Sequence, residues 1–278
     1  MMKKTATIIL NRNLPKPTDV LYEHLNKYDG NYTDIYVVEA GSDEDRLSKY
    51  CTWYVNDESV KKNGLRYGRG MNYGIQQLVK EGKYRDYDAL FLLTNDTVLR
   101  EEPSVKPLEE LMNAYKHIGI LSPCSKRWGE KNLIDERGVT CFWFIHNNAY
   151  YIRREFIDKI ADFSTTDYMQ FLFDGTNFRG YLTEEELIAK AYANDYTAAI
   201  TNKVWVEENE SHLLEHAQLI KTESYSDNLK LYIEEGLNWV KKKYGFNSRW
   251  TMQQYVRQFY EAYFEYHPEL KDFCVRAY

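Results

Sequence analysis

The sequence has few cysteines, no excess of basic residues and no long apolar run, and each shortage excludes a class of protein. Its four cysteines are scattered, without a C-x-x-C pair or a matching histidine spacing, which argues against a zinc site or a disulfide scaffold. The formal net charge is −6, so nucleic acid is not an expected partner. No stretch approaches the ~20 apolar residues of a membrane span. The apolar run at residues 8–10 is too short for a signal-peptide core, so we expect a cytoplasmic protein with reduced thiols.

What the 278 residues do contain is an alternation of two patterns. Short apolar runs with strand character alternate with amphipathic helical stretches, which predicts an α/β fold with a largely parallel sheet and right-handed crossovers. Pro15 and Pro17 should break the chain ahead of the first helix, and Thr183 and Glu186 form a capping-box pattern. The expected strands are 7–10, 34–40, 52–55, 87–93, 118–121, parts of 141–152, and 196–206; the expected helices are 20–25, 71–82, 107–115, 154–160 and one from 183.

From residue 213 the pattern is helical to the end, so we expect a domain over 1–212 and a helical C-terminal extension over 213–278. The extension contains WVKKKYGFNSRW, which mixes lysine with aromatic residues. One interpretation is a lid or homodimer surface packed on the core. The other is a peripheral contact with an anionic membrane, at the inner face, where a lipid-linked acceptor resides.

Polar side chains follow three of the expected strands at their carboxyl ends. In open α/β sheets ligands bind outside these ends, so we expect a binding site there. The residues concerned are Asn11, Arg12 and Asn13 after the first strand, Glu39 to Asp43 after the second, and Asn95 and Asp96 after the strand at 87–93.

Taken in order, several segments resemble the landmarks of family-2 glycosyltransferases with the GT-A fold, over roughly residues 5–210. The order and spacing carry the resemblance, because no single motif is specific. It implies a nucleotide-diphospho-sugar transferase fold, with a Rossmann-like mixed sheet flanked by helices. The segments are TIILNRN, IYVVEAGSDED, GRGMNYGI, LFLLTNDTVL, IGILSP, NNAYYIRREFID and YLTEEELIAKAYANDYTAAITNKVWV.

The resemblance implies transfer of a sugar, with inversion, from a UDP-, dTDP- or GDP-sugar to a hydroxyl of a glycan or lipid-linked acceptor. Surface polysaccharide or glycan synthesis is the implied setting. For Asp43 the alternative role is to cap a helix, and for Arg69 it is an exposed position at a helix start. Asn72 could fix its helix start instead. The implied donor-binding residues are Asn11, Arg12, Asn13, Glu39, Asp43, Arg69, Asn72 and Asn95.

A divalent metal, Mn²⁺ or Mg²⁺, is also implied, because it neutralises the charge that develops on the departing diphosphate. Such ions prefer oxygen ligands, which Asp96 at a strand tip can supply. Asn95 departs from the two-acid motif of the family, and a turn role is the alternative for Asp96. Where the family often has a metal-binding histidine this chain has Glu207, which leaves His212, a few residues later, as the candidate.

The acceptor hydroxyl needs a general base, and the resemblance places it in the acidic start of the helix at 183. Glu184 or Glu185 is the expected catalytic residue, with Glu184 first, whereas Glu186 can serve the capping box. The family usually has Glu-Asp or Asp-Asp here, so the all-Glu cluster leaves the choice open.

Two other functions compete. A nucleotidyltransferase would carry a glycine-rich basic loop after the first strand, and the loop NRNLPKP has no glycine. A non-catalytic protein that binds a nucleotide-sugar or glycan on the same fold is compatible with the single acid in TNDT.

Overall fold

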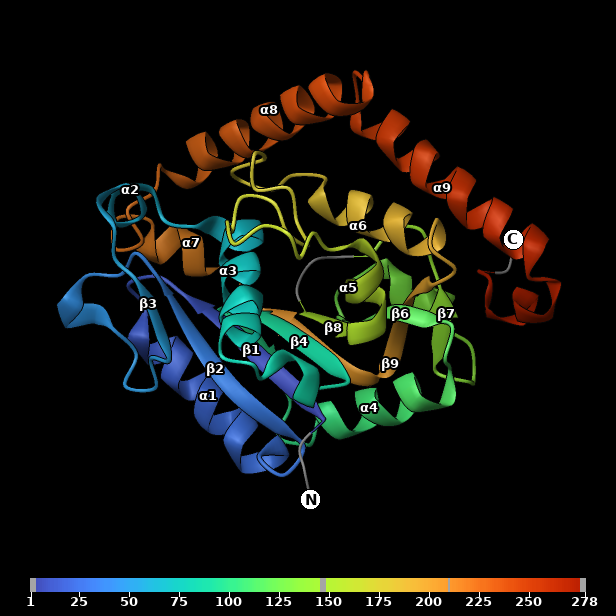
Figure 1. The fold of residues 1–278 in the computed structure, drawn as a ribbon, viewed down its shortest axis with the longest axis horizontal. Helices are drawn as coiled ribbons and strands as arrows, with labels where there is room; N and C mark the ends of the chain where they lie inside the picture. The colour runs from blue at the N-terminus through green and yellow to red at the C-terminus, as the bar shows by residue number, and fades with distance from the viewer. Residues whose placement is uncertain (1–3, 146–148, 210, 276–278) are drawn as a thin grey trace.

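The computed structural model describes residues 4–145, 149–209 and 211–275, and it does not describe the side chains of residues 212–214. The described strands form one nine-stranded mixed sheet with helices packed around it (Figure 1). Its order is β3 (Trp53–Val55), β2 (Thr33–Ala40), β1 (Thr5–Asn11), β4 (Ala89–Thr94), β8 (Ala149–Arg153), β6 (Ile118–Cys124), β9 (Thr197–Glu208) and β5 (Thr97–Leu99), and β7 (Val139–Cys141) pairs with β9.

The expected α/β architecture is confirmed, but the sheet is parallel only in part. Strands β3, β2, β1 and β4 run parallel, so their carboxyl ends meet at one edge. Strand β8 is antiparallel to both of its neighbours, β4 and β6, and β5 and β7 are antiparallel to β9. The fold is therefore a mixed sheet, and its four-stranded parallel portion is where a ligand edge is expected.

Helix α3 (Arg66–Lys80) sits directly on the parallel portion. A Cβ on Gly70 would lie 2.4 Å from a methyl carbon of Leu10, and one on Gly74 would lie 2.9 Å from Ile8. The glycines therefore allow the helix to approach β1 closely. Helix α1 (Pro15–Asp29) also packs on strands of this portion, β1 and β2. The expectation that the two prolines break the chain was wrong: both lie in the first helical turn, where a missing N–H costs nothing.

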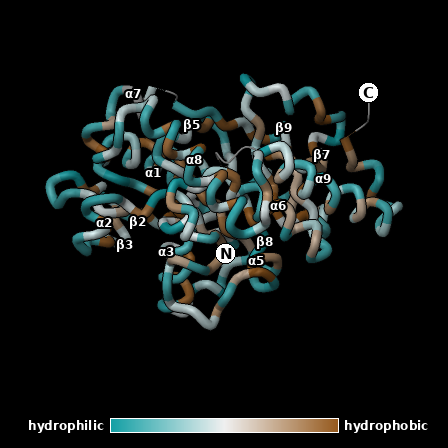
Figure 2. The backbone as a smooth tube through the Cα atoms, turned by 90° about the horizontal axis from the view of Figure 1, so that it is seen from above, coloured by the Kyte–Doolittle hydropathy of each residue, from teal (hydrophilic) through white to brown (hydrophobic). Residues whose placement is uncertain are grey.

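The remaining helices are distributed over both ends of the sheet. Seen from above, α1, α2 and α7 lie at one end of the molecule, and β7 and α9 lie at the other (Figure 2). No helix within the described ranges is long and apolar enough to span a bilayer. The bounds are α2 (Glu58–Asn63), α4 (Val105–Ala114), α5 (Arg154–Ile160), α6 (Thr183–Tyr192), α7 (Ser211–His216), α8 (Tyr225–Tyr244) and α9 (Arg249–Tyr266), with short 3₁₀ turns at Glu44–Arg46, Tyr84–Asp86, Gly129–Leu133 and Pro268–Phe273.

The C-terminal helices pack onto α6 rather than standing apart from the core. The Tyr192 ring meets Tyr260 and Tyr263 of α9 edge-on, at centroid distances of 5.4 and 5.6 Å. Such pairs add to the stabilisation that burial of the rings already provides. The α9 helix therefore covers one side of α6.

The start of α6 differs from the expected capping box. The Thr183 hydroxyl donates to the Gly180 carbonyl, and the residue before the helix, Leu182, adopts a left-handed conformation at φ +70°. Glu186 instead accepts from the Tyr244 hydroxyl at 2.5 Å and pairs with Lys243 at 2.7 Å. Glu186 thus ties α6 to the end of α8.

Replacement of Gly236 tests how closely α8 rests on the loop before α6. A Cβ there would lie 2.5 Å from the Tyr181 Cβ and 2.6 Å from its carbonyl oxygen. Gly236→Ala should lower the free energy of unfolding by about 1–2 kcal/mol, because the clash with backbone outweighs the gain in helix propensity. Urea denaturation measures this, with Gly129→Ala, which faces open space, as the control. An unchanged or raised midpoint for Gly236→Ala would contradict the close packing.

Candidate functional site

A buried carboxylate joins the carboxyl ends of the parallel strands. Glu39, at the end of β2, is 0% exposed, and its two oxygens accept from the Asn11 side-chain amide at 3.0 and 2.9 Å. It also accepts from the Ser42 hydroxyl at 2.5 Å and the Ser48 N–H at 2.7 Å. The Asn11 carbonyl oxygen in turn accepts from the Asn95 amide at 2.7 Å. These hydrogen bonds link three predicted donor-binding residues, Asn11, Glu39 and Asn95. Glu39 itself is fully buried beneath the site.

A cavity of about 200 Å³ opens over this network, at the edge where β1, β2 and β4 end. It brings together four residues that the sequence predicted, and it adds Arg66, at the start of α3, which the sequence did not indicate. Its lining includes Asn11, Arg12, Arg66, Asn95, Asp96 and Ile220.

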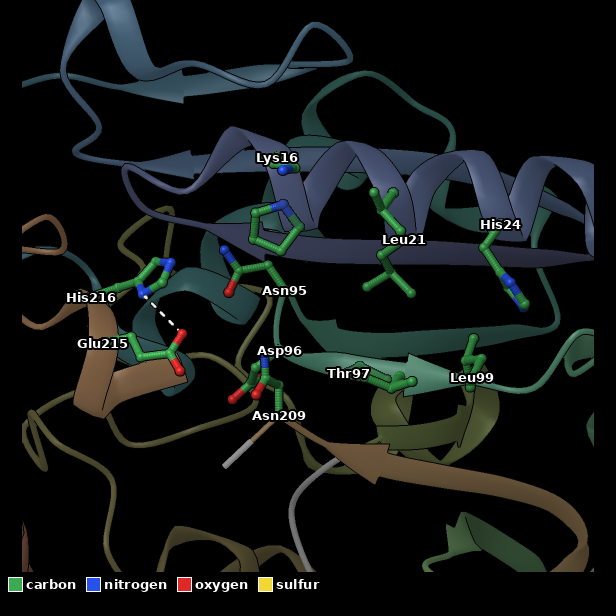
Figure 3. Close-up of a pocket in the computed structure, with 13 residues that line it drawn as sticks. Lys16, Leu21, His24, Asn95, Asp96, Thr97, Leu99, Asn209, Glu215 and His216 are labelled. Atoms are coloured by element: carbon green, nitrogen blue, oxygen red, sulfur yellow. Dashed lines mark ion pairs between the residues drawn. The ribbon is translucent and has the colours of Figure 1, made fainter. Parts of the chain in front are cut away.

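A second cavity, of about 320 Å³, lies against the same strand tip and shares Asn95 and Asp96 with the first. Figure 3 shows Asp96 beside Asn209, with the α1 side chains on one side and His216 and Glu215 on another. The half-buried Asp96 accepts a hydrogen bond from the Thr94 hydroxyl, and its backbone carbonyl accepts from the Asn209 N–H at 2.9 Å. Asp96 therefore belongs to the walls of both cavities.

The Asp96 carboxylate, at a strand tip in the wall of two cavities, is of a kind that could hold a divalent metal, and substrate oxygens and water would then supply the other ligands. The side chain of His212, the predicted metal ligand, lies outside the described residues. Four residues later, His216 lines the Asp96 cavity, with its Nδ1 4.0 Å from the Glu215 carboxylate. Within the described part of the chain, no three His, Cys, Asp or Glu side chains cluster closely enough to hold a metal alone. One or two carboxylates with phosphate oxygens and water is the usual environment of Mg²⁺.

Asn13 and Asp43 face each other across the loops that follow β1 and β2. The Asn13 side-chain carbonyl accepts from the Asp43 N–H at 2.7 Å, and its amide donates to the Leu219 carbonyl at 2.7 Å. Lys221 pairs with the Asp43 carboxylate at 2.5 Å and is the main reason that the pKa of Asp43 is lowered. The segment at 217–223 therefore crosses this rim of the first cavity, and its Ile220 lines that cavity.

Asn72 and Arg69 lie apart from the first cavity. The fully buried Asn72 amide donates to the Tyr168 and Phe173 carbonyls at 2.9 and 2.8 Å. Its carbonyl oxygen accepts from the Leu172 and Phe173 N–H groups at 3.1 and 2.9 Å, so all four of its hydrogen bonds are used. The Arg69 Nε donates to the Gly175 carbonyl at 2.7 Å. In this structure both side chains hold the loop at 168–175.

Glu184 and Glu185 stand together in the first turn of α6. Glu184 is half-buried, and its Oε2 has no hydrogen-bond partner among the described residues. Burial raises the pKa of the Glu184 carboxyl well above its usual range, and the charge of Glu185 raises it further. A carboxylate in this state readily takes up a proton.

Three tyrosines are coupled electrostatically to this carboxylate, and nothing in the sequence indicated them. Burial raises the pKa of Tyr67, Tyr150 and Tyr232, and the charge on Glu184 is the next contribution for each. For Tyr232 the charge of Glu208 also contributes. These tyrosines therefore share the desolvated environment of Glu184.

No protein-family model matches the chain, and no curated protein matches it. Among solved structures it is similar to S. aureus TarS residues 1–349, with 14% identity and a TM-score of 0.52 over 87% of this chain and 72% of that one. The same TarS fragment in complex with UDP-GlcNAc gives 14% identity and a TM-score of 0.53 over 95% and 73%. TarS is a GT-A glycosyltransferase, so the predicted GT-A fold is confirmed.

Replacement of Asn72 tests its role in the loop at 168–175. Asn72→Ala leaves four backbone groups without the hydrogen bonds of the Asn72 side chain, and it should lower the free energy of unfolding by about 2–4 kcal/mol. Urea denaturation measures the loss, and hydrogen exchange at 168–173 should speed up at the same time. Asn238→Ala, at an exposed position of α8, is the control and should change little. If Asn72→Ala were as stable as the control, the side chain would not be holding the loop.

Proposed function

We propose that this protein is a metal-dependent glycosyltransferase that moves a sugar from a nucleotide-sugar donor to an acceptor hydroxyl. The observation that carries the proposal is the cavity where three parallel strands end, in which Asn11, Arg12, Asn95 and Asp96 converge. A nucleotide-sugar is supported as the ligand because a TarS structure with the same fold holds UDP-GlcNAc.

The donor occupies the first cavity. Glu39 holds the buried Asn11, and Asn11 and Thr18 hold the Asn95 amide, so the side-chain carbonyl oxygen of Asn95 is preorganised. Arg12 and Arg66 present guanidinium groups, which match the geometry of phosphate oxygens. Asp43, on the rim, is suited to the nucleoside, and the buried Asn13 holds it in place.

Asp96 and His216 would hold the metal, with Glu215 beside them. When bound, the ion neutralises negative charge on the leaving diphosphate. Because Asp96 lines both cavities, its carboxylate is placed between the proposed donor and the residues of α7.

Glu184 acts as the general base. The acceptor hydroxyl gives its proton to the Glu184 carboxylate as its oxygen bonds to the anomeric carbon. The bond from that carbon to the phosphate oxygen breaks, and the nucleoside diphosphate leaves with the electron pair. Attack opposite the leaving group inverts the anomeric centre, as in other direct displacements at sugars. The raised pKa brings the base nearer to working pH.

One observation favours a second candidate, a non-catalytic protein that binds nucleotide-sugars. The strand tip carries the amide Asn95 where the related motif has a second acid, so this motif offers a metal only one carboxylate, that of Asp96. Binding without turnover would identify this case.

The donor test is a thermal-shift and hydrolysis panel of UDP-, GDP-, dTDP- and CMP-sugars with and without Mn²⁺. One nucleotide class should raise the melting temperature more with metal than without it. Asp96→Ala should abolish the metal-dependent part and slow donor hydrolysis, whereas Asp86→Ala, at an exposed position, should change neither. A metal-dependent shift without hydrolysis or transfer would favour the non-catalytic protein. No shift with any donor would reject both functions.

The base test compares Glu184→Gln and Glu185→Gln across pH. Glu184→Gln should bind donor normally but lose about 10²–10⁴-fold in transfer rate. The wild-type rate should fall as pH drops through the raised pKa of Glu184, that is, at a pH above the usual glutamate range. Glu185→Gln removes a charge that raises this pKa, so the acid limb should move to lower pH while turnover persists. The reverse pattern, with turnover lost only in Glu185→Gln, would assign the base to Glu185.

A further inference from the structure

Three arginines gather around one phenylalanine beside the proposed donor cavity. The guanidinium carbons of Arg66, Arg69 and Arg179 lie 5.4, 4.7 and 5.6 Å from the centre of the Phe178 ring. Two of them come from α3, and the third comes from the loop that leads into α6. These three residues are called the arginine cluster below.

One guanidinium group of the arginine cluster has no ion pair among the described residues. Arg179 pairs with Glu235 and, at 2.6 Å, with Glu223, and Arg66 lies 3.6 Å from that same Glu223. Arg69 forms no ion pair with any described residue. Burial lowers the pKa of Arg69, and the charges of Asp167 and Glu235, which are near it but not ion-paired with it, oppose this change.

Repulsion between arginine side chains reaches the donor cavity through Arg66 and Arg12. Burial lowers the pKa of Arg66, and the charge of Arg179 lowers it further. Burial and the charge of Arg66 lower the pKa of Arg12 to about 10. The Nε atoms of Arg12 and Arg66 are buried and have no hydrogen-bond partner among the described residues. An added anion would relieve this crowding.

The arginine cluster also has room for a ligand. A third cavity, of about 420 Å³, is lined by Arg69, Phe178, Arg179 and Glu235. It shares Gly64 with the donor cavity, whose wall includes Arg66. The two cavities are therefore neighbours, with the arginine cluster between them.

We propose that this third cavity is an anion subsite that binds a phosphate or carboxylate group of the acceptor. That the ligand is an acceptor rests on the proposed function. Arginine forks match both oxyanions, and Glu223 and Glu235 occupy those forks in the present structure. Arg179 lies five residues before the proposed base Glu184, which is in the first turn of α6. Five residues span at most about 18 Å, so an acceptor that is held in the third cavity and extends over that length can present a hydroxyl to the base. The acceptors are then anionic molecules.

The experiment titrates the full chain with glycerol 3-phosphate and with glucuronate by calorimetry, using glycerol and glucose as uncharged counterparts. At least one anion should bind, and its uncharged counterpart should not. Binding should persist when the nucleotide that stabilises the protein is present at saturation. If neither anion binds, or if the nucleotide abolishes binding, the proposal is wrong; in the second case the arginine cluster serves the donor diphosphate.

Paired variants locate the site. Arg69→Ala should weaken anion binding about tenfold or more, because a charged hydrogen-bonding partner is lost. Glu235→Gln should tighten it severalfold, because a competing carboxylate is removed, and this gain cannot come from misfolding. Arg257→Ala and Glu261→Gln, which alter an exposed ion pair on α9, match the charge changes and should have no effect. Equal effects in the cluster variants and these controls would overturn the proposal.

These experiments distinguish failure of the anion subsite from failure of the proposed glycosyltransferase function. Anion binding that depends on Arg69, in a protein that binds no nucleotide, would keep the anion subsite and reject the proposed function. Nucleotide binding and transfer without anion binding would do the opposite.

Discussion

The site depends on one buried carboxylate. Glu39 is fully removed from water, and burying a charge is costly unless every lone pair is used. Asn11, Ser42 and the Ser48 backbone supply the compensating hydrogen bonds, and they come from the ends of two strands and the turn between β2 and β3. The hydrogen bonds to Glu39 therefore fix the loops after β1 and β2 together. Asn11 also accepts from Asn95, the residue after β4, and so fixes that strand end as well.

This constraint explains why Asp96 can be half-exposed and still well placed. The residue before it is held by Asn11, and its own backbone is held by Asn209 after β9. Under the proposed function, the side chain then needs no rigid set of protein partners, and it would offer oxygens to an ion that takes its other ligands from substrate. In the proposed metal site, the fixed backbone on either side of Asp96 thus serves in place of a close group of acidic side chains.

The sequence predicted the parts of this site that depend on local order. Strand ends were recognisable from apolar runs, and parallel strands bring their carboxyl ends together, so Asn11, Arg12, Asn95 and Asp96 could be grouped in advance. The sequence could not decide which of two nearby residues of the same type reaches the site. Arg66 and Arg69 lie about one turn apart on α3, and the packing of that helix on Leu10 decides which one lines the first cavity. Glu186 leaves the group of candidate bases because Lys243 and Tyr244, far along the chain, bind it.

Two electrostatic imbalances of opposite sign lie close together in the sequence, one in the loop before α6 and one in the first turn of that helix. At residue 184 a desolvated carboxylate with a raised pKa favours uptake of a proton. Near residue 179 three guanidinium groups gather around Phe178, and one of them, Arg69, has no ion pair with a described residue. Each imbalance carries a cost in the free protein, because like charges crowded in a poorly solvated site repel. Under the proposed function, a single acceptor that has a hydroxyl and an anionic group would relieve both, because its proton would go to Glu184 and its charge to the arginines. The cost in the free protein is then recovered only with a bound acceptor of that kind, which links acceptor choice to the chemical step.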